Sequence, residues 1–298
     1  MKSVYILILL LIHTFFMVST GYGQNLQRDS IQIILEEAYY RDQASRLIID
    51  SLMRSGTSDG NKYLPVIKQQ EQADSMNLAI VPPIIDMIYE SQMYDLDSTA
   101  YKACWIVIQH APDVIMHKYE DFIKQLVERK LISVYSYMAY IDRCKVRQSK
   151  AQIYGWQFKR LSNGITIQFP ILIGVEAKWK ELGIEYEENT LIPDEYNAQY
   201  MSKKRCIDDT QFVVIGTISS NDPNPTDNVS ISINGIEIPP QGPHNFFETI
   251  VWKQELPIIV KVATQSNSEE YIIKRNNETD YIFLNCFVDG KTIDIRNE

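Results

Sequence analysis

WIVIQHAPDVIMHKYEDFIKQLVERKLISVYSYMAYIDRCKVRQSKAQIYGWQ, residues 105–157, places many polar side chains within an otherwise apolar helical pattern. The polar set comprises Gln109, His110, Asp142, Arg143, Gln152, Tyr154 and Gln157, together with Gly155. A buried polar group without a hydrogen bond costs roughly 1–3 kcal/mol, and an unpaired buried charge costs more. We therefore expect these side chains to bond to one another, to the backbone or to a ligand.

The chain before and within this stretch shows the spacing of amphipathic helices. The first predicted helix is capped by Asp29 or Ser30, and its apolar positions continue through Leu47, Ile48 and Leu52. Further helices are predicted over residues 63–76, 80–94, 100–108 with Asp97 as the cap, 112–127 with Pro112 in the first turn, and after a Ser133 cap.

The periodicity becomes that of strands after Lys150. Residues 152–158 and 165–171 are predicted strands joined through Ser162-Asn163-Gly164, a favourable hairpin turn. From Cys206 onward, short β-type runs follow one another at spacings typical of an antiparallel sandwich; they are 212–218, 229–233, 246–252, 258–263, 271–274, 281–287 and 292–295. The predicted fold class is therefore α+β, with a mainly helical N-terminal domain that carries a β-hairpin and a C-terminal antiparallel β-sandwich, immunoglobulin-like or transthyretin-like.

These patterns divide the chain into four segments. Residues 1–23 are predicted to be a signal peptide, because an apolar run follows Lys2 and small residues lead to Gly23. The competing interpretation is a retained N-terminal anchor, although the run is short for a membrane span. A helical domain over 24–195, a linker over 196–206 and a β-sandwich over 207–298 would follow. The expected location is periplasmic or secreted, with no transmembrane segment after cleavage.

Composition excludes several classes of function. The 298 residues carry a formal net charge of -9 and the pI is near 5.1, which opposes attraction to nucleic acid. The compact basic run Lys203-Lys204-Arg205 is interpreted as a solvated linker. No zinc-type frame, P-loop or dinucleotide-binding glycine motif occurs, so neither a metal nor a cofactor is predicted.

Export would place the four cysteines in an oxidising compartment. A Cys206–Cys286 bridge is one interpretation, and four unpaired thiols packed as small hydrophobes is the other, because sequence does not fix connectivity. Cys104 and Cys144 lie within apolar helical pattern, where an inert thiol is expected.

Five short motifs occur in order: DQASR at 42–46, DSMN at 74–77, WIVIQH at 105–110, YIDR at 140–143 and QIYGWQ at 152–157. Together they resemble an uncharacterised family of largely exported bacterial proteins with the pattern DQxxR, DxxN, QH, DR and QxYGxQ. That family usually has an acidic residue soon after QHA and a threonine in YGTQ, whereas here Pro112 precedes Asp113 and Trp156 replaces the threonine. The resemblance implies positions of interest and no reaction.

The polar set allows a chemical and a structural interpretation. In the first, His110 is a general acid or base near neutral pH, Asp142 orients it, and Arg143 or Arg46 holds an anionic group. In the second, Asp42 pairs with Arg46, Asp142 pairs with a neighbouring arginine, and the glutamines bond to backbone groups. The candidate ligand-binding residues are Asp42, Gln43, Arg46, Gln109, His110, Asp142, Arg143, Gln152, Tyr154 and Gln157.

We therefore expect an exported binding or interaction module with a polar pocket in its helical domain, whose partner is a polar ligand or an envelope protein. The alternative is a cell-envelope hydrolase that uses His110 and Asp142 as an acid/base pair, with a bound water as nucleophile. Convergence of the polar set on a concave pocket that solvent reaches would favour a site, and mutual burial would favour a structural network.

Overall fold

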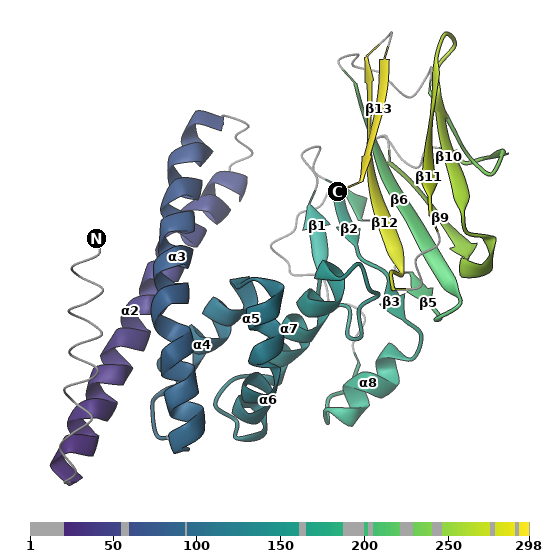
Figure 1. The fold of residues 1–298 in the computed structure, drawn as a ribbon. Coiled ribbons are helices and arrows are strands. Elements are labelled where there is room, and N and C mark those ends of the chain that lie inside the picture. Colours follow the sequence, from purple (N-terminus) through teal and green to yellow (C-terminus); the bar gives the residue numbers. More distant parts are fainter. Residues whose placement is uncertain are drawn as a thin grey trace. The chain divides into compact units, whose positions relative to one another are not determined.

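The computed structural model describes residues 21–54, 60–92, 94–160, 165–186, 200–201, 205–220, 229–239, 246–274, 278–289 and 292–297 (Figure 1). Helices come first and strands follow, so the fold class is mixed α+β, as predicted. Residues 1–20, which hold most of the predicted signal peptide, lie outside the described residues, as do the predicted turn at 162–164 and most of the predicted linker.

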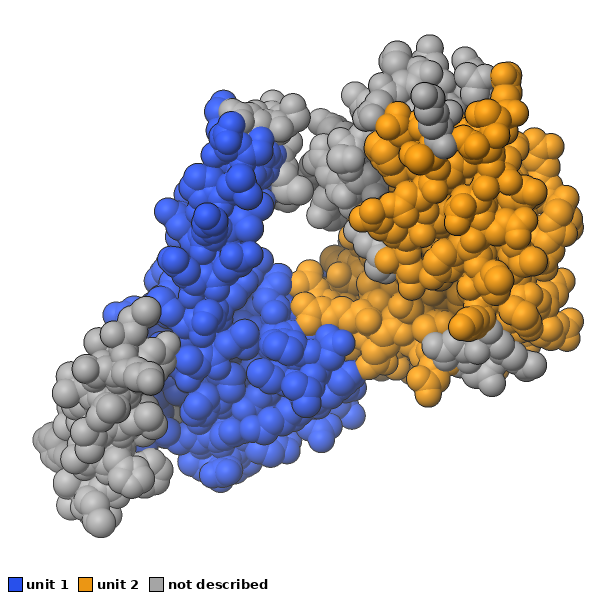
Figure 2. Space-filling model, turned by 45° about the horizontal axis from the view of Figure 1, so that its top comes forward, with its two compact units in different colours: residues 1–137 blue, residues 138–298 orange. Residues whose placement is uncertain are grey.

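The chain divides into two compact units, Met1–Tyr137 and Met138–Glu298, which Figure 2 shows in blue and orange. The division falls inside a helix, earlier in the chain than the predicted linker at 196–206. Within the described ranges, no helix combines the length and the apolar character that a membrane crossing requires.

Unit 1 is helical. Its elements are α2 (Gly21–Arg54), α3 (Gly60–Ser91), α4 (Ser98–His110), α5 (Asp113–Lys118) and α6 (Glu120–Glu128). The long helices α2 and α3 run side by side, and α4 packs against both (Figure 1). Ile31, Leu35 and Ala38 of α2 are buried at helical spacing, and they face a core to which α3 contributes Ile85 and Ile88.

The predicted start signals of two helices are confirmed. The Asp97 carboxylate accepts hydrogen bonds from the backbone N–H groups of Thr99, at 3.0 Å, and Ala100, at 3.3 Å. The Ser133 hydroxyl accepts one from the backbone N–H of Ser136 at 3.1 Å. These local bonds satisfy donors that the first turn of a helix leaves open.

The predicted start of the first helix is wrong, because α2 begins at Gly21 and Asp29 and Ser30 lie inside it. Three further features of the helical pattern differ from the prediction. The helices predicted over 63–76 and 80–94 are one helix, α3, which continues through Pro82 and Pro83. Proline weakens a helix interior, but burial of the flanking Val81 and Ile84 and a hydrogen bond from Tyr119 to the Pro82 carbonyl hold this segment in place. The helix predicted over 112–127 is instead divided into α5 and α6.

The third difference concerns the face that α2 buries. Leu47 and Ile48 were predicted to extend its apolar stripe, but Leu47 is 65% exposed and Ile48 is 47% exposed. Asp42 and Ser45 continue the buried face instead. The inward face of α2 therefore changes from apolar to polar along the helix, which is where its functional candidates lie.

Unit 2 holds every strand of the described residues, together with most of α7 (Val134–Arg147) and the unpredicted helix α8 (Val175–Glu181). The strands are β1 (Phe158–Arg160), β2 (Ile165–Gln168), β3 (Ile171–Leu172), β4 (Tyr200–Met201), β5 (Cys206–Ile207), β6 (Gln211–Ser220), β7 (Ser230–Ile233), β8 (Ile236–Glu237), β9 (Phe246–Trp252), β10 (Ile258–Ala263), β11 (Ser268–Ile273), β12 (Tyr281–Asp289) and β13 (Thr292–Asn297). Each strand predicted after Cys206 is present, and β1 pairs antiparallel with β2. The strand predicted over 152–158 is wrong for residues 153–157, which form a loop whose backbone N–H groups bond to Asp142. The strand predicted over 165–171 is divided into β2 and β3.

Most of these strands form two four-stranded sheets, in the orders β13-β12-β6-β9 and β11-β10-β7-β8. The first sheet is mixed rather than purely antiparallel, because β6 pairs parallel with β12, with Val213 opposite Tyr281. Parallel neighbours need a long connection, and here the chain passes through the second sheet between them.

Strand β6 contributes to two apolar cores because its side chains alternate between the two faces of the sheet. Phe212, Val214 and Ile218 belong to a core that both four-stranded sheets line. Val213 and Ile215 belong to a second core, on the opposite face, which also includes Ala151, Ile167, Ile207, Phe246, Tyr281 and Phe283. The continuous apolar run of this strand follows from burial on both sides.

The end of α7 is tied to the start of β12. The Asp280 carboxylate accepts a hydrogen bond from the backbone N–H of Ala151 at 2.9 Å and pairs with Lys253 at 2.7 Å. The Tyr281 hydroxyl donates to the Val146 carbonyl at 2.7 Å. These bonds place the C-terminal part of α7 in the same unit as the sheets.

Two expectations from the sequence need correction. Arg205, predicted to be solvated, is buried and forms an ion pair with Glu248 of β9. All four cysteines lie in the described part of the chain and form no disulfide there, so the Cys206–Cys286 bridge is not formed. Cys286 faces the core between the two sheets, whereas Cys206 is exposed beside Ile207 of the opposite core. Burial raises the pKa of the Cys286 thiol to about 12, so this thiol is inert near neutral pH.

Gly216 of β6 provides a test of this packing. A Cβ atom at this position would overlap the Phe247 ring, so we expect Gly216→Ala to lower the free energy of unfolding by about 1–3 kcal/mol, as overpacking does. Gly60→Ala is the control, because no heavy atom lies within 4 Å of its added Cβ. Denaturant titration of both variants measures the difference, and equal stability of the two would contradict the described packing.

Candidate functional site

The predicted polar set is divided between the two units, and we describe its members in each unit in turn. Asp42, Gln43, Arg46, Gln109 and His110 belong to unit 1, and the candidates from Asp142 onward belong to unit 2. We name the first group the Asp74 cluster, which consists of Asp42, Gln43, Arg46, Gln70, Asp74, Asn77 and His110. The second is the Asp142 loop, which consists of Asp142 and residues 152–157.

The Asp74 cluster begins with an ion pair on α2. The Arg46 guanidinium donates to both oxygens of Asp42, at 2.9 and 3.1 Å, in the two-point geometry that arginine and carboxylate favour. Asp42 is only 1% exposed, and Gln43 donates a further hydrogen bond to it at 2.8 Å. The predicted pairing of Asp42 with Arg46 is confirmed.

Arg46 also connects α2 to α3. Its guanidinium donates to Oδ1 of Asp74 at 2.9 Å, so one cation lies between two carboxylates. The Gln70 amide donates to the same Asp74 oxygen at 2.8 Å. Asp74 retains 32% exposure of its side chain, in contrast to Asp42.

A second link between the same helices runs through Asn77. Its amide donates to the Ala38 carbonyl at 3.0 Å, and its oxygen accepts a hydrogen bond from Arg41 at 2.7 Å. Asn77 is 1% exposed. The DxxN spacing therefore has a physical role, because it places the carboxylate and the amide on the face of α3 that meets α2.

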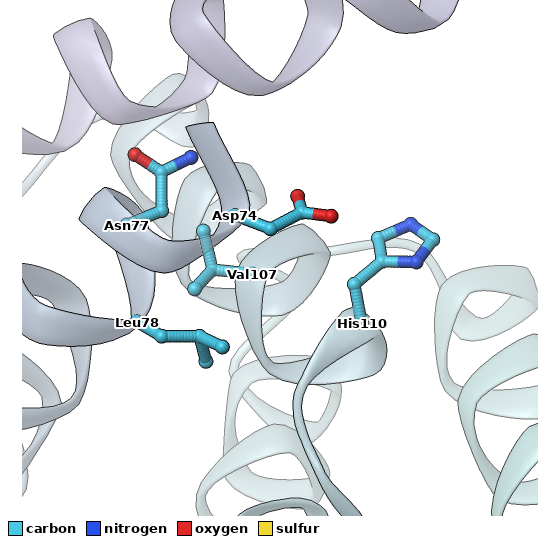
Figure 3. A pocket seen from close by; sticks show the side chains of 5 residues that line it. All are labelled: Asp74, Asn77, Leu78, Val107 and His110. Atoms are coloured by element: carbon cyan, nitrogen blue, oxygen red, sulfur yellow. The ribbon is translucent and has the colours of Figure 1, made fainter. Parts of the chain in front are cut away.

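A small, shallow hollow lies between α3 and α4, lined by Asp74, Asn77, Leu78, Val107 and His110. Figure 3 shows the Asp74 carboxylate extending from α3 toward the His110 ring at the end of α4, with Leu78 and Val107 as the apolar part of the lining. His110 is half-buried, and Gln109 beside it is buried. The hollow thus combines polar groups from two helices with an apolar wall.

Asp74 and Asn77 were marked by a motif in the sequence but were absent from the candidate set. Gln70 and Arg41 were not singled out at all. The signal for Gln70 is its position one helical turn before Asp74, on the same face of a helix.

The Asp142 loop has a different character. Asp142 is fully buried on α7. Its Oδ1 accepts hydrogen bonds from the backbone N–H groups of Ile153, at 2.7 Å, and Tyr154, at 3.0 Å. Its Oδ2 accepts from Tyr154, at 3.2 Å, and Trp156, at 2.8 Å. Both oxygens are therefore committed to the backbone of the loop.

The two glutamines of QIYGWQ hold the same loop in place. The Gln152 amide nitrogen donates to the carbonyls of Gln157, at 3.1 Å, and Phe169, at 2.8 Å. Its oxygen accepts from the backbone N–H of Gln157 at 2.5 Å. The Gln157 side chain donates to the Ala139 carbonyl of α7 at 2.9 Å. The predicted bonding of these glutamines to backbone groups is confirmed.

Aromatic packing completes this loop. The backbone carbonyl of Tyr154 accepts a hydrogen bond from the Trp179 indole at 3.1 Å, and the Trp156 and Trp179 rings stack 6.3 Å apart. Gly155 has a φ of 86°, which favours glycine because a Cβ is strained there. Trp156, which departs from the family pattern, is therefore part of the packing between this loop and α8.

This geometry assigns Asp142 a structural role. It was predicted to orient His110 or to pair with an arginine, but the hydrogen bonds of both its oxygens go to backbone N–H groups. Burial raises the pKa of Asp142 from 3.8 to about 6, and the backbone N–H groups, led by that of Trp156, oppose the rise. Arg143, beside it on α7, is half-buried.

No group of three histidine, cysteine, aspartate or glutamate side chains that could hold a metal ion occurs among the described residues. Comparisons with known proteins add no assignment, because no family model, no curated protein and no solved structure matches the chain.

The structural role of Asp142 predicts that the substitution Asp142→Asn lowers the stability of the fold. In Asp142→Asn one carboxylate oxygen becomes an NH₂ group that faces backbone N–H donors, so we expect the free energy of unfolding at pH 7 to fall by about 2 kcal/mol or more. Asp289→Asn, on the exposed end of β12, is the matched control and should change little. An unchanged melting temperature of Asp142→Asn would contradict this role.

The raised pKa of Asp142 also predicts a pH dependence. The carboxyl group of Asp142 stays protonated up to about pH 6 in the folded chain, whereas its ordinary pKa is 3.8. Asp142 therefore contributes most stability below pH 4, and this contribution is lost as pH rises through 6. The stability difference between the parent and Asp142→Asn should therefore shrink by on the order of 3 kcal/mol between pH 4 and pH 7. Denaturant titrations at both pH values test the sign, and a difference that grows with pH would refute it.

Proposed function

We propose that this chain is an exported binding or interaction module whose helical unit holds a small polar group in the hollow at the Asp74 cluster. The observation that carries the proposal is the meeting of Asp74 and His110, from two different helices, at one hollow. Concave sites with a few converging polar groups and an apolar wall are the usual form of ligand sites.

The contrast between the two polar groups supports a binding role for one of them. In the Asp142 loop the carboxylate is fully buried and bonded to backbone on both oxygens. In the Asp74 cluster the carboxylate is partly exposed, and one of its oxygens receives both of its hydrogen bonds. A group that only stabilises the fold would be expected to resemble the first arrangement.

The proposal includes export and membership of the uncharacterised family with the pattern DQxxR, DxxN, QH, DR and QxYGxQ. What supports it is the apolar run near the N-terminus and the gathering of motif residues Asp42, Arg46, Asp74, Asn77 and His110 in one part of unit 1. In this proposal the mature protein works in the periplasm or outside the cell, on a polar ligand or an envelope protein.

We also propose that the two four-stranded sheets form a β-sandwich of immunoglobulin-like or transthyretin-like type, which serves adhesion or positioning. The apolar core that both sheets line supports this assignment. Sheets packed face to face through such a core define sandwich architecture.

A hydrolase is the second candidate, and one observation favours a revised form of it. His110 shares its hollow with Asp74, so Asp74 rather than Asp142 would be the carboxylate that acts beside it. A water bound there would be the nucleophile, with His110 as its general base. Hydrolysis of a ligand that binds at the hollow would show that the protein is a hydrolase rather than a binding module.

The binding proposal predicts separate effects of His110 on stability and on ligand response. His110→Ala removes a half-buried side chain, so we expect a stability change within about 1 kcal/mol. In a thermal-shift screen of cell-envelope sugars, peptides and nucleotides, a ligand of the hollow should stabilise the parent and fail to stabilise the variant. His117→Ala, with 45% side-chain exposure on α5, is the matched control. A large loss of stability in His110→Ala with no ligand response in the parent would contradict the proposal.

A further inference from the structure

A larger hollow lies in unit 2, at the end of β9. Its volume of about 410 Å³ leaves room for water-sized molecules, and the described residues that line it are Thr210, Trp252, Lys253 and Gln254. Sites for small molecules begin at a volume of about 300 Å³. This hollow is therefore large enough for a ligand that contains a ring.

Trp252 contributes the apolar surface of this hollow. Side chains alternate along β9, so Trp252 lies on the same face as Phe246 and Ile250. The apolar core on that face buries Phe246, but at the end of the strand Ile250 is 43% exposed and Trp252 is 47% exposed. An indole ring exposed beside a hollow offers a ligand a flat apolar surface and one N–H donor.

The backbone around Trp252 is held by hydrogen bonds. The pairing of β9 with β6 extends to Trp252, which lies opposite Gln211. The backbone N–H of Lys253 donates to the Thr210 carbonyl at 2.8 Å, and the backbone N–H of Trp252 donates to the Glu255 carboxylate at 3.2 Å. A ligand would therefore meet a preformed surface, which lowers the entropic cost of binding.

The polar groups at the hollow include both donors and acceptors. Neither the Trp252 indole N–H nor the Gln254 amide has a hydrogen-bond partner among the described residues. The Lys253 ammonium donates to Asp280 at 2.7 Å, and an ammonium group carries three N–H donors. The Thr210 hydroxyl donates to a neighbouring carboxylate at 2.5 Å, so its oxygen can still accept.

The charges around the hollow favour a neutral ligand. Lys253 forms an ion pair with Asp280, and the two side chains are 16% and 13% exposed. The carboxylates of Asp208 and Glu255 are bonded to residues of the lining. An anion would meet these carboxylates and a cation would meet the Lys253 ammonium, and like charges placed together oppose binding.

We propose that this hollow binds a neutral pyranose ring. The C–H groups on one face of the ring pack against the Trp252 indole, and the hydroxyl groups exchange hydrogen bonds with Gln254, Lys253 and Thr210. The site goes beyond the function proposed for the Asp74 cluster and does not depend on it. A proline-rich peptide also packs against aromatic side chains, but it offers carbonyl acceptors without hydroxyl donors and would use fewer of these groups.

The first test localises binding in the full chain, whose four tryptophans are replaced by 5-fluorotryptophan. Loss of one fluorine signal in Trp252→Phe identifies the signal of Trp252. Cellobiose and N,N′-diacetylchitobiose are the sugar probes, and sorbitol is the comparison because it carries hydroxyl groups without a ring. We expect a saturable shift of the Trp252 signal with one or both sugars. No shift with either sugar, or an equal shift with sorbitol, would overturn the proposal.

The second test measures the affinity of each variant for the sugar by ligand-observed saturation-transfer NMR. We expect Trp252→Ala to weaken binding by at least about tenfold, Trp252→Phe to retain part of the affinity, and Gln254→Ala to weaken it severalfold. Phe287→Ala is the matched control, because Phe287 is an aromatic residue of the same sheet with 41% exposure. Unchanged affinity of Trp252→Ala would refute the site.

Failure of this inference is distinguishable from failure of the proposed function. His110→Ala alters the hollow in unit 1 and should bind the sugar as tightly as the parent does. Loss of sugar binding in that variant would contradict the assignment of the sugar to Trp252. Tighter binding of N-acetyl-triproline amide than of either sugar at the Trp252 signal would overturn the carbohydrate assignment in favour of a peptide.

Discussion

The buried carboxylate of Asp142 is the interaction on which the middle of the chain depends. A charge removed from water needs several donors at short range. In the described part of the chain, the donors bonded to the two oxygens are backbone N–H groups of the loop that follows α7. The loop therefore wraps around the end of this helix. Two further hydrogen bonds connect this region to its surroundings. The Gln157 side chain donates to the Ala139 carbonyl of α7, and the Ala151 N–H donates to Asp280. The C-terminal part of α7 therefore belongs to the unit that contains the sheets.

The two polar groups of the chain solve the same physical problem in different ways. The Asp142 loop satisfies its carboxylate and its glutamines internally, and it joins segments that are close in sequence. The Asp74 cluster joins α2 to α3 across a longer separation, and it leaves the Asp74 side chain 32% exposed. Internal bonds on every polar atom fix a loop, whereas a partly exposed carboxylate at a hollow can bind a ligand.

Local patterns predicted the elements well, because periodicity and capping are properties of neighbouring residues. The Asp97 and Ser133 caps, the strands after Cys206 and the Asp42–Arg46 pair all follow from spacing. The grouping of the polar residues in space does not follow from spacing. Closeness in sequence joined His110 to Asp142, but the chain assigns them to different units, and the partner of His110 at the hollow is Asp74, from another helix.

The remaining differences arise from tertiary packing, which no short window of sequence contains. Burial of Val81 and Ile84 carries α3 through two prolines, and Glu248 of a distant strand accounts for the burial of Arg205. The sequence likewise cannot show that the Gln70 amide nitrogen donates to Asp74 and that its oxygen has no hydrogen-bond partner in the described structure. Polar side chains are the hardest to assign from sequence, since their partners are specific atoms rather than an apolar environment.

Because β6 is buried on both faces, it determines the boundaries at which a stable fragment of this protein can begin. A fragment that begins at residue 207, the predicted start of the β-sandwich, would keep the core between the sheets but lose Ala151 and Ile167 from the opposite face. Val213, Ile215 and Phe283 would then meet water on that side, and an exposed apolar patch of this kind promotes aggregation. A soluble fragment of the C-terminal half should therefore include α7 and the β1–β2 hairpin, so that dissection of the chain follows its cores rather than the change from helices to strands.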